Sequence, residues 1–391
     1  MRYNFDKVID RSGTSAEKVE GLKHIWGRTD LIPLWVADMD FATAPFVTDA
    51  IRKRCENEVL GYTGKPDSYY NAIINWVKQR YDLVVAKEMI NFVPGIVPGI
   101  GMAMNCFTQK GDKVMIQPPV YHPFAWVTTR NERTLVTNPL KWENGMYRMD
   151  LDTFREQIKG CKLLILCTPH NPGGVVWTEA ELRAIADICY DEKVLVFSDE
   201  IHADLTLPPH THRPFATVSE KARMNSVTFM SPSKAFNMPG LSASHALIFN
   251  EDLRKRFRIY MDAGELDMGH VFAFLSVEAA YSHGTEWLDQ CLAYIQGNID
   301  FVDEFLKKHA PKIKAIRPEA SYLVWLDCRE LKLSQKDLNE FFVDKAHLAL
   351  NDGEMFGKEG IGFMRLNVAS PRCIIEKAMK QLADAYQLYI K

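Results

Sequence analysis

The sequence of 391 residues predicts an α/β protein in which helices flank a mostly parallel sheet. Two observations favour this class. Short runs of apolar and β-branched residues, which are typical of buried strands, recur through the middle of the chain. Segments with apolar residues at helical spacing separate these runs. Strands that alternate with helices usually form strand–helix–strand units, whose strands are parallel.

The predicted elements of the middle of the chain follow from local patterns. Thr178, with Glu181 three residues later, forms a capping box that begins a helix ending near Asp191. A glycine-rich run, residues 95–101, opens an apolar helix over residues 102–107. The predicted strands are residues 113–116, 163–167, 194–198, 226–230 and 245–249.

The last hundred or so residues predict a smaller α+β lobe. A long amphipathic helix, residues 286–309, leaves the first lobe. We therefore expect a large domain of residues 46–285 and a small domain of residues 286–391. In the small domain the predicted strands are residues 321–327 and 363–368, and the predicted helices are residues 334–344 and 373–389.

Composition excludes some classes of function. The net charge of -3 and the pI near 6.4 predict no general attraction to nucleic acid or to anionic membranes. A regulator of transcription would need an added DNA-binding domain, and the predicted elements leave no residues for one. The eight cysteines contain no C-x-x-C pair, so we expect reduced thiols. The first residues lack an apolar signal core, and no apolar run approaches membrane-spanning length, so we expect a cytoplasmic protein.

Three polar side chains follow predicted strands, at the edge where open α/β sheets bind ligands. Lys234, Asp199 and Asn171 each lie at or just past the end of one strand. A lysine amine can form a Schiff base with an aldehyde, a carboxylate can keep a pyridine nitrogen protonated, and an amide can donate to a ring phenolate. A single lysine in such a loop is usually only solvated, but the three together predict pyridoxal 5′-phosphate as the cofactor.

Other residues are candidates for holding the cofactor phosphate. Ser231 and Ser233 supply two hydroxyls in the loop that leads to Lys234. In the glycine-rich run, the backbone amides of Ile96 and Val97 are predicted to face an anion at a helix N-terminus. A glycine-rich turn alone is a weak signal, because most such turns only reverse the chain. The serines and the lysine in the same chain favour the phosphate role.

Over essentially its whole length the sequence resembles the fold-type I pyridoxal-phosphate enzymes, the aspartate-aminotransferase superfamily. Three runs, residues 34–41 (LWVADMDF), 119–121 (PVY) and 231–240 (SPSKAFNMPG), are similar to the MalY/PatB group of cysteine-S-conjugate β-lyases. The resemblance implies a seven-stranded sheet in the large domain. It also implies that the N-terminal segment, residues 1–45, joins the small domain.

The same resemblance implies further site residues. It places the Tyr121 ring over the cofactor, where a half-buried core tyrosine is the alternative, and it makes Val36 and Ala37 substrate-binding residues. It also implies a homodimer in which Tyr62 reaches the partner's site and donates to the phosphate. Many relatives carry an arginine for this phosphate where this chain has Ser242, which gives Tyr62 and the serines more of that role.

Arg365 lies in an apolar, strand-like run, where an unpaired guanidinium is costly. A substrate α-carboxylate would satisfy it, and the family places its carboxylate-binding arginine in a matching run. A structural salt bridge is the alternative. His202 is close enough in sequence to orient Asp199 by a hydrogen bond. His210 and His212 lie in an irregular segment without other ligands at metal spacing, so we predict a surface loop and no metal site.

These observations predict a pyridoxal-phosphate-dependent carbon–sulfur β-lyase that cleaves cystathionine-like conjugates to a thiol, pyruvate and ammonia. In this hypothesis Lys234 holds the cofactor and then removes the Cα proton, and Asp199 keeps the ring protonated. An aminotransferase is the alternative, because the motifs of the cofactor site serve a carbanion that both reactions share.

Overall fold

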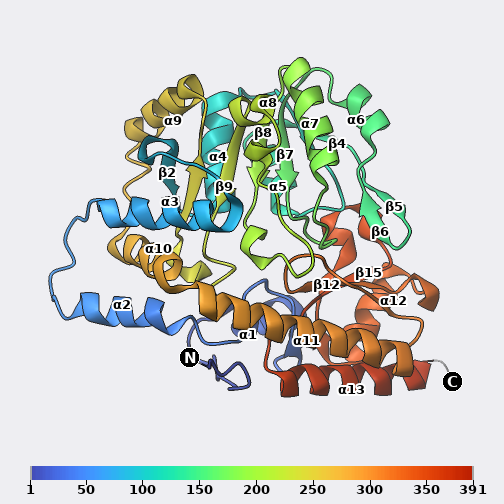
Figure 1. The fold of residues 1–391 in the computed structure, drawn as a ribbon. Coiled ribbons are helices and arrows are strands. Elements are labelled where there is room, and N and C mark those ends of the chain that lie inside the picture. The colour runs from blue at the N-terminus through green and yellow to red at the C-terminus, as the bar shows by residue number, and fades with distance from the viewer. Residues whose placement is uncertain (1, 390–391) are drawn as a thin grey trace.

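The computed structural model describes residues 2–389, and a mixed sheet of seven strands dominates it (Figure 1). The strand order is β2-β10-β9-β8-β7-β3-β4, and β10 is antiparallel to both of its neighbours. The mostly parallel, seven-stranded sheet predicted from the sequence is therefore confirmed. The strands are β2 (Ile90–Val93), β3 (Lys113–Ile116), β4 (Thr134–Thr137), β7 (Cys161–Cys167), β8 (Leu195–Asp199), β9 (Ser226–Met230) and β10 (Ser244–Leu247).

Helices cover both faces of this sheet because its strands are apolar on both sides. Along β7, Leu163 and Ile165 pack into one hydrophobic cluster with α4, α5 and α9. Leu164 and Leu166 point the other way, toward α6, α7 and α8. The helices are α3 (Asp67–Tyr81), α4 (Ile96–Phe107), α5 (Pro123–Arg130), α6 (Leu151–Gln157), α7 (Glu179–Asp191), α8 (Glu220–Met224), α9 (Glu251–Ala263) and α10 (Val271–His283).

Two helix starts show how local sequence sets the boundaries. Helix α7 begins at the predicted capping box, in which Thr178 and Glu181 each accept a backbone hydrogen bond from the other. Helix α4 begins earlier than predicted, directly after Gly95, whose φ of 127° suits a residue without a Cβ atom. The rest of the glycine-rich run belongs to the helix. Its apolar residues Ile96 and Ile100 pack against the sheet.

The second sheet has four antiparallel strands in the order β11-β12-β15-β14. The helix predicted over residues 334–344 is α12 followed by a π-helical turn at Phe341–Lys345. These elements are β11 (Lys314–Ile316), β12 (Leu323–Asp327), β14 (Asn351–Asp352), β15 (Phe363–Asn367), α11 (Thr285–His309), α12 (Gln335–Glu340) and α13 (Arg372–Tyr389). A separate hairpin consists of β5 (Lys141–Glu143) and β6 (Met146–Arg148).

The N-terminal segment packs against C-terminal elements. Strand β1 (Ile32–Pro33) follows helix α1 (Glu17–Trp26) and pairs in parallel with β13 (Leu348–Ala349). Helix α2 (Pro45–Cys55) comes next in the chain and packs against α10. We propose on this basis that residues up to 45 form one domain with residues 286–391, and that residues 46–285 form the large domain.

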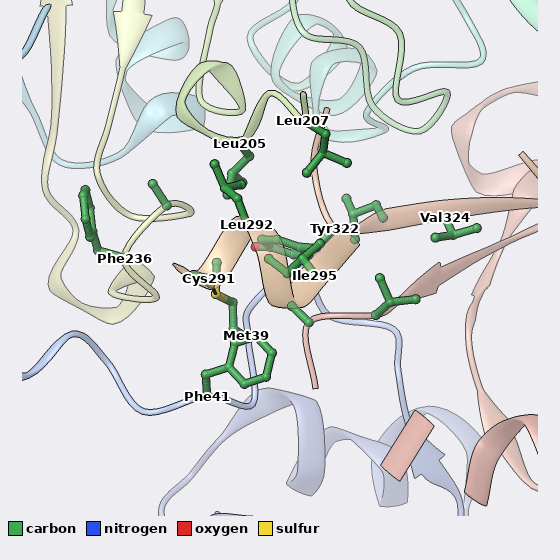
Figure 2. Close-up of a cluster of buried hydrophobic side chains, with 14 of the residues drawn as sticks. Met39, Phe41, Leu205, Leu207, Phe236, Cys291, Leu292, Ile295, Tyr322 and Val324 are labelled. Carbon is green, nitrogen blue, oxygen red and sulfur yellow. Dashed lines mark hydrogen bonds between the residues drawn. The ribbon is translucent and has the colours of Figure 1, made fainter. Parts of the chain in front are cut away.

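A hydrophobic cluster joins the N-terminal segment, the C-terminal elements and the loops of the large sheet (Figure 2). From α11, Cys291 and Ile295 pack against the N-terminal segment, which contributes Met39, and against Tyr322, which directly precedes β12. This cluster fixes the N-terminal segment close to the loops that follow β8 and β9. None of the helices in residues 2–389 is long and apolar enough to cross a membrane.

Candidate active site

The carboxyl ends of β7, β8 and β9 meet at a pocket of about 210 Å³. The parallel register places these strand ends at one edge, as the sequence predicted. Nine of the predicted site residues line the pocket. They are Ala37, Ile96, Val97, Tyr121, Asn171, Asp199, His202, Ser233 and Lys234.

Lys234 projects into this pocket from the turn after β9. Its Nζ atom donates a hydrogen bond to the backbone carbonyl of Ala37, 2.5 Å away. Burial, and next the positive charge of Arg365, lower the pKa of Lys234 to about 8. The amine is therefore largely enclosed by protein, and a substantial fraction of it is neutral near pH 8, as a nucleophile or a base requires.

Asp199 lies at the end of β8 and is buried. One carboxylate oxygen accepts a hydrogen bond from the backbone of Ile201 at 3.1 Å. Burial is the main cause that raises the pKa of Asp199 to about 7. His202 is also buried, and burial lowers its pKa to about 3. The predicted His202–Asp199 hydrogen bond is not found among the described residues: the Asp199 carboxylate accepts from the Ile201 backbone instead, and the buried Nδ1 atom of His202 has no partner.

The N-terminus of α4 lies at the pocket wall. Gly95 precedes the helix without a side-chain cap, and the backbone amides of Ile96 and Val97 begin it at the pocket wall. Ser233 lines the same pocket. Ser231 does not line it. The Ser231 hydroxyl donates to the carbonyl of Ala243 at 2.7 Å and accepts from the backbone N–H of Ser233 at 3.1 Å, and the Ser233 Oγ atom lies 2.8 Å from the same oxygen. Ser231 therefore lies behind the wall and fixes Ser233.

Arg365 lies behind Asn171, on β15. Its guanidinium donates to Asn171 Oδ1 and to the carbonyl of Trp35, both at 3.1 Å, and also to Asn351 Oδ1. In the part of the chain that the structure describes, no carboxylate pairs with it, so the salt bridge considered as an alternative is not found. Burial lowers the pKa of Arg365 to about 10. The Nε atom is buried without a partner, which leaves donor capacity for an incoming anion.

Three more predicted residues have distinct positions. The Tyr121 ring lines the pocket and packs edge-on against Phe124, with ring centroids 5.7 Å apart. Val36 offers its carbonyl to Asn367 rather than its side chain to the pocket. Tyr62 is 98% exposed and lies outside the pocket of its own chain. Its predicted role in a partner's site stays a prediction.

The histidine loop differs from the prediction in one respect. His210 is partly exposed, but His212 is buried and pairs with Glu200 at 2.7 Å. Glu200 also accepts bonds from the Ser198 hydroxyl and the Phe215 backbone, so the pair anchors the loop after β8. Within residues 2–389 no group of three His, Cys, Asp or Glu side chains is arranged to hold a metal ion.

Sequence patterns missed several residues of the site. Cys167, Ile201, Ser242 and Ser244 line the pocket without a predicted binding role. Cys167 could have been found, because it ends the predicted strand 163–167 beside Asn171. Ser242 was noted only as a missing arginine, and its left-handed backbone, with φ of 47°, turns the chain toward the pocket.

Comparisons with known proteins agree with this geometry. The model of the family "Aminotransferase class I and II" matches residues 29–382. Cystathionine beta-lyase PatB of Bacillus subtilis is 37% identical, and the match covers 98% of this chain and 99% of PatB.

Two crystal structures are also similar over nearly the whole chain. A PLP-bound putative aminotransferase from Clostridium difficile has a TM-score of 0.96 and 40% identity, with 98% of this chain and 100% of that chain covered. A PLP-bound C-S lyase from Staphylococcus hominis has a TM-score of 0.91 and 35% identity, with 98% of both chains covered. The match over most of the chain, together with the arrangement of Lys234, Asp199, Asn171 and Arg365, shows that this chain belongs to the aminotransferase class I and II family, in the group that includes PatB.

Proposed function

We propose that this protein is a pyridoxal 5′-phosphate-dependent carbon–sulfur β-lyase. It converts a cystathionine-like cysteine conjugate and water to a thiol, pyruvate and ammonia. The observation that carries the proposal is the shared pocket of Lys234 and Asp199, with Arg365 directly behind Asn171. The 37% identity to a cystathionine beta-lyase and the likeness to a C-S lyase structure support this reaction over others of the family.

The residues of the pocket fit the cofactor. The α4 amides of Ile96 and Val97, with the Ser233 hydroxyl, form a donor set for a phosphate. Asp199 provides a buried carboxylate for a pyridine nitrogen, and Lys234 provides the amine for the aldehyde. When bound, pyridoxal phosphate supplies an aldehyde that links covalently to an amine and a ring that takes up electrons from Cα.

The protein groups divide the remaining work. A buried carboxylate is costly unless a positive charge faces it, so Asp199 favours a protonated ring nitrogen. Arg365 binds the substrate α-carboxylate through its planar fork of donors. Lys234, released when the substrate amine takes its place, accepts the Cα proton at Nζ. The lowered pKa of Lys234, about 8, keeps a useful fraction of the amine neutral for this step.

The elimination balances without an oxidant or a second substrate. The Cα–H electron pair moves toward Cβ, the Cβ–S bond breaks, and the thiolate leaves with the electron pair of that bond. The thiolate gains a proton and departs as the thiol. Water then hydrolyses the remaining three-carbon fragment to pyruvate and ammonia.

An aminotransferase remains the second candidate. The 40% identical structure from Clostridium difficile is that of a putative aminotransferase, and nothing in the pocket geometry excludes that outcome. The two reactions differ only in what happens after Cα loses its proton. A transaminase returns a proton to the cofactor, and it then needs a 2-oxo acid to complete each cycle.

Product analysis with L-cystathionine separates the two functions. Purified enzyme without any 2-oxo acid should form pyruvate steadily, far beyond one equivalent per chain. The Lys234→Ala variant should form none, whereas Lys336→Ala, which changes an 85% exposed lysine, should match the wild type. A transaminase would convert L-cystathionine to the corresponding 2-oxo acid with the Cβ–S bond intact. If that 2-oxo acid forms in place of pyruvate, stops by one equivalent and resumes only with 2-oxoglutarate, the aminotransferase function is assigned instead.

The proposal includes a homodimer in which Tyr62 completes the partner's phosphate site. The segment around Tyr62 is apolar and exposed, with Val59 72% and Leu60 58% accessible, which is unusual for a surface that stays in water. Ser242 carries no charge where many relatives have an arginine, so an additional phosphate donor has a clear role. We also propose a cytoplasmic location, since all eight cysteines are unpaired thiols.

A further inference from the structure

The backbone of residues 35–38 is held by side chains at every carbonyl. Arg365 donates to the carbonyl of Trp35. The Asn367 amide donates to the carbonyls of Val36 and Asp38, at 2.7 and 2.6 Å. The carbonyl between them, that of Ala37, is the acceptor of the Lys234 amine. Although this segment has no regular secondary structure, each of its four carbonyls accepts a hydrogen bond, as carbonyls in a paired strand do.

The Ala37 carbonyl has a second donor, the hydroxyl of Tyr322, at 2.9 Å. Tyr322 is fully buried in the cluster that packs against α11 (Figure 2). Asn367 is 1% exposed and ends β15, two residues after Arg365. Side chains two apart on a strand point to the same face. One strand therefore presents both the carboxylate-binding candidate and the anchor of this segment.

Charged side chains hold the far end of the segment. Lys18 is 0% exposed, and its amine contacts Asp40 at 2.8 Å and Asp38 at 3.5 Å. Arg11 pairs with Asp38 at 2.6 Å. Such an arrangement of opposite charges, partly shielded from water, restricts the backbone that carries the carboxylates. Ala37 lies within this hydrogen-bonded segment and lines the pocket beside Lys234.

The contact between Lys234 and Ala37 bears on one stage of the proposed reaction. Once the substrate amine has taken its place, Lys234 carries an unattached amine on a flexible side chain. Such a side chain has many rotamers, and only some of them direct Nζ toward Cα. The carbonyl of Ala37 is an acceptor within reach of that amine, and it selects among these rotamers.

We propose that the Ala37 carbonyl, fixed by Tyr322 and Asn367, is the resting place of the released Lys234 amine and holds it in position to take the Cα proton. Tyr322 and Asn367 are then positioning residues, because each acts through the backbone of residues 36–38. This inference rests on the proposed function of Lys234 and extends it to residues that need not touch the substrate.

The arrangement also connects substrate binding to the base. Arg365 contacts the same segment through Trp35, and its charge lies close enough to Lys234 to lower that pKa. A substrate carboxylate on Arg365 would offset this charge and make the amine a stronger base. The amine would thus gain proton affinity when a substrate is in place.

Tyr322→Phe tests the proposal, because it removes one hydroxyl and keeps the buried ring. Tyr389→Phe is the matched control, since it deletes a hydroxyl that donates to the carbonyl of Leu331 at 2.8 Å, far from the pocket. The first measurement is acetylation of the cofactor-free proteins with trace acetic anhydride at pH 7. Mass spectrometry compares Lys234 with Lys336, the exposed internal standard.

In Tyr322→Phe the Lys234 peptide should be acetylated at least about threefold faster, because a less fixed acceptor stabilises the ammonium form less. The second measurement is turnover by the holoenzyme. Misplacement of the base should lower kcat about tenfold, with a smaller change in KM, and should not lower the deuterium isotope effect with Cα-deuterated substrate. Tyr389→Phe should match the wild type in both measurements.

An acetylation rate of Lys234 equal to that of the wild type overturns the proposal, whatever happens to turnover. An unchanged kcat overturns it as well. If Tyr322→Phe does not fold, Asn367→Ser serves in its place, because serine retains a donor for one of the two carbonyls. A wild-type enzyme that forms no pyruvate would count against the proposed function alone, because the acetylation rates are measured without substrate.

Discussion

Replacing Asp199 with asparagine should abolish turnover and yet stabilise the cofactor-free protein at alkaline pH. The substitution keeps the shape of the side chain and an oxygen for the backbone amide of Ile201, but it removes a charge buried at the end of β8. Burial raises the pKa of Asp199 to about 7. The positive charge of Lys234 lowers this pKa, but by less than burial raises it, so the buried charge of Asp199 is only partly compensated.

The size of the effect follows from the shift in pKa. The folded-state pKa of Asp199 is raised from 3.8, so the unfolded chain releases the proton first as the pH rises. The resulting loss of stability is absent below about pH 4 and complete above pH 7, where it reaches about 4 kcal/mol. Between pH 5 and pH 8 the wild type should therefore lose about 2–3 kcal/mol more stability than Asp199→Asn loses.

Urea unfolding of both cofactor-free proteins at pH 5 and pH 8 measures this difference, because the other titrating groups are common to the two proteins. Adding pyridoxal phosphate at pH 8 should reverse the order, since a ring cation stabilises the wild-type carboxylate and cannot pair with the amide. An identical pH dependence for the two proteins would refute the reasoning, because it would mean that burial does not disfavour the charge of Asp199.

Three further predictions concern the substrate, the base and the subunits. Arg365→Leu should raise KM for every amino-acid substrate by about 100-fold, and an unchanged KM in steady-state kinetics would leave Arg365 with a structural role only. The pH profile of kcat should rise from pH 6 and level off only above pH 8, because the Lys234 amine must be neutral to accept a proton, and its pKa of about 8 in the cofactor-free protein rises when a substrate carboxylate offsets the charge of Arg365; a flat profile from pH 6 to 8 contradicts that assignment. Tyr62→Ala should weaken cofactor binding, and mixing it with inactive Lys234→Ala should restore activity after subunit exchange, since one site of each mixed dimer keeps both residues. Confirmed mixed dimers without such recovery would exclude a role for Tyr62 in the partner's site.

The sheet could be predicted largely because its strands are buried on both faces. Most residues of strands β7, β8 and β9 are apolar and buried, and the polar site residues lie at the carboxyl ends of these strands, along one edge. Strand β2 was not predicted although Pro94 and Gly95 mark its end, because it has only four residues and Asn91 interrupts the apolar run. The antiparallel direction of β10 depends on how the chain returns to the sheet, which no local pattern records.

The site could be predicted where function requires particular residue types at strand ends, as with Lys234 and Asp199. Contacts between segments that are distant in the sequence could not be predicted in this way. Arg365 was predicted to need an anion, yet its protein partners are a backbone carbonyl and two amides, one of them from Asn351. His212 was predicted to be exposed, because its pairing with Glu200 arises only when the loop folds back over β8. Tyr322 and Asn367 carry no motif at all.

The central claim is that one pocket holds pyridoxal phosphate through Lys234. Borohydride reduction of the purified holoenzyme locks the cofactor onto the amine that holds it, and peptide mapping by mass spectrometry identifies that amine. The adduct should lie on the peptide that contains Lys234 and should be absent from Lys234→Ala, whereas Lys336→Ala should retain it. An adduct on a different lysine, or a stable adduct in Lys234→Ala, would contradict the account.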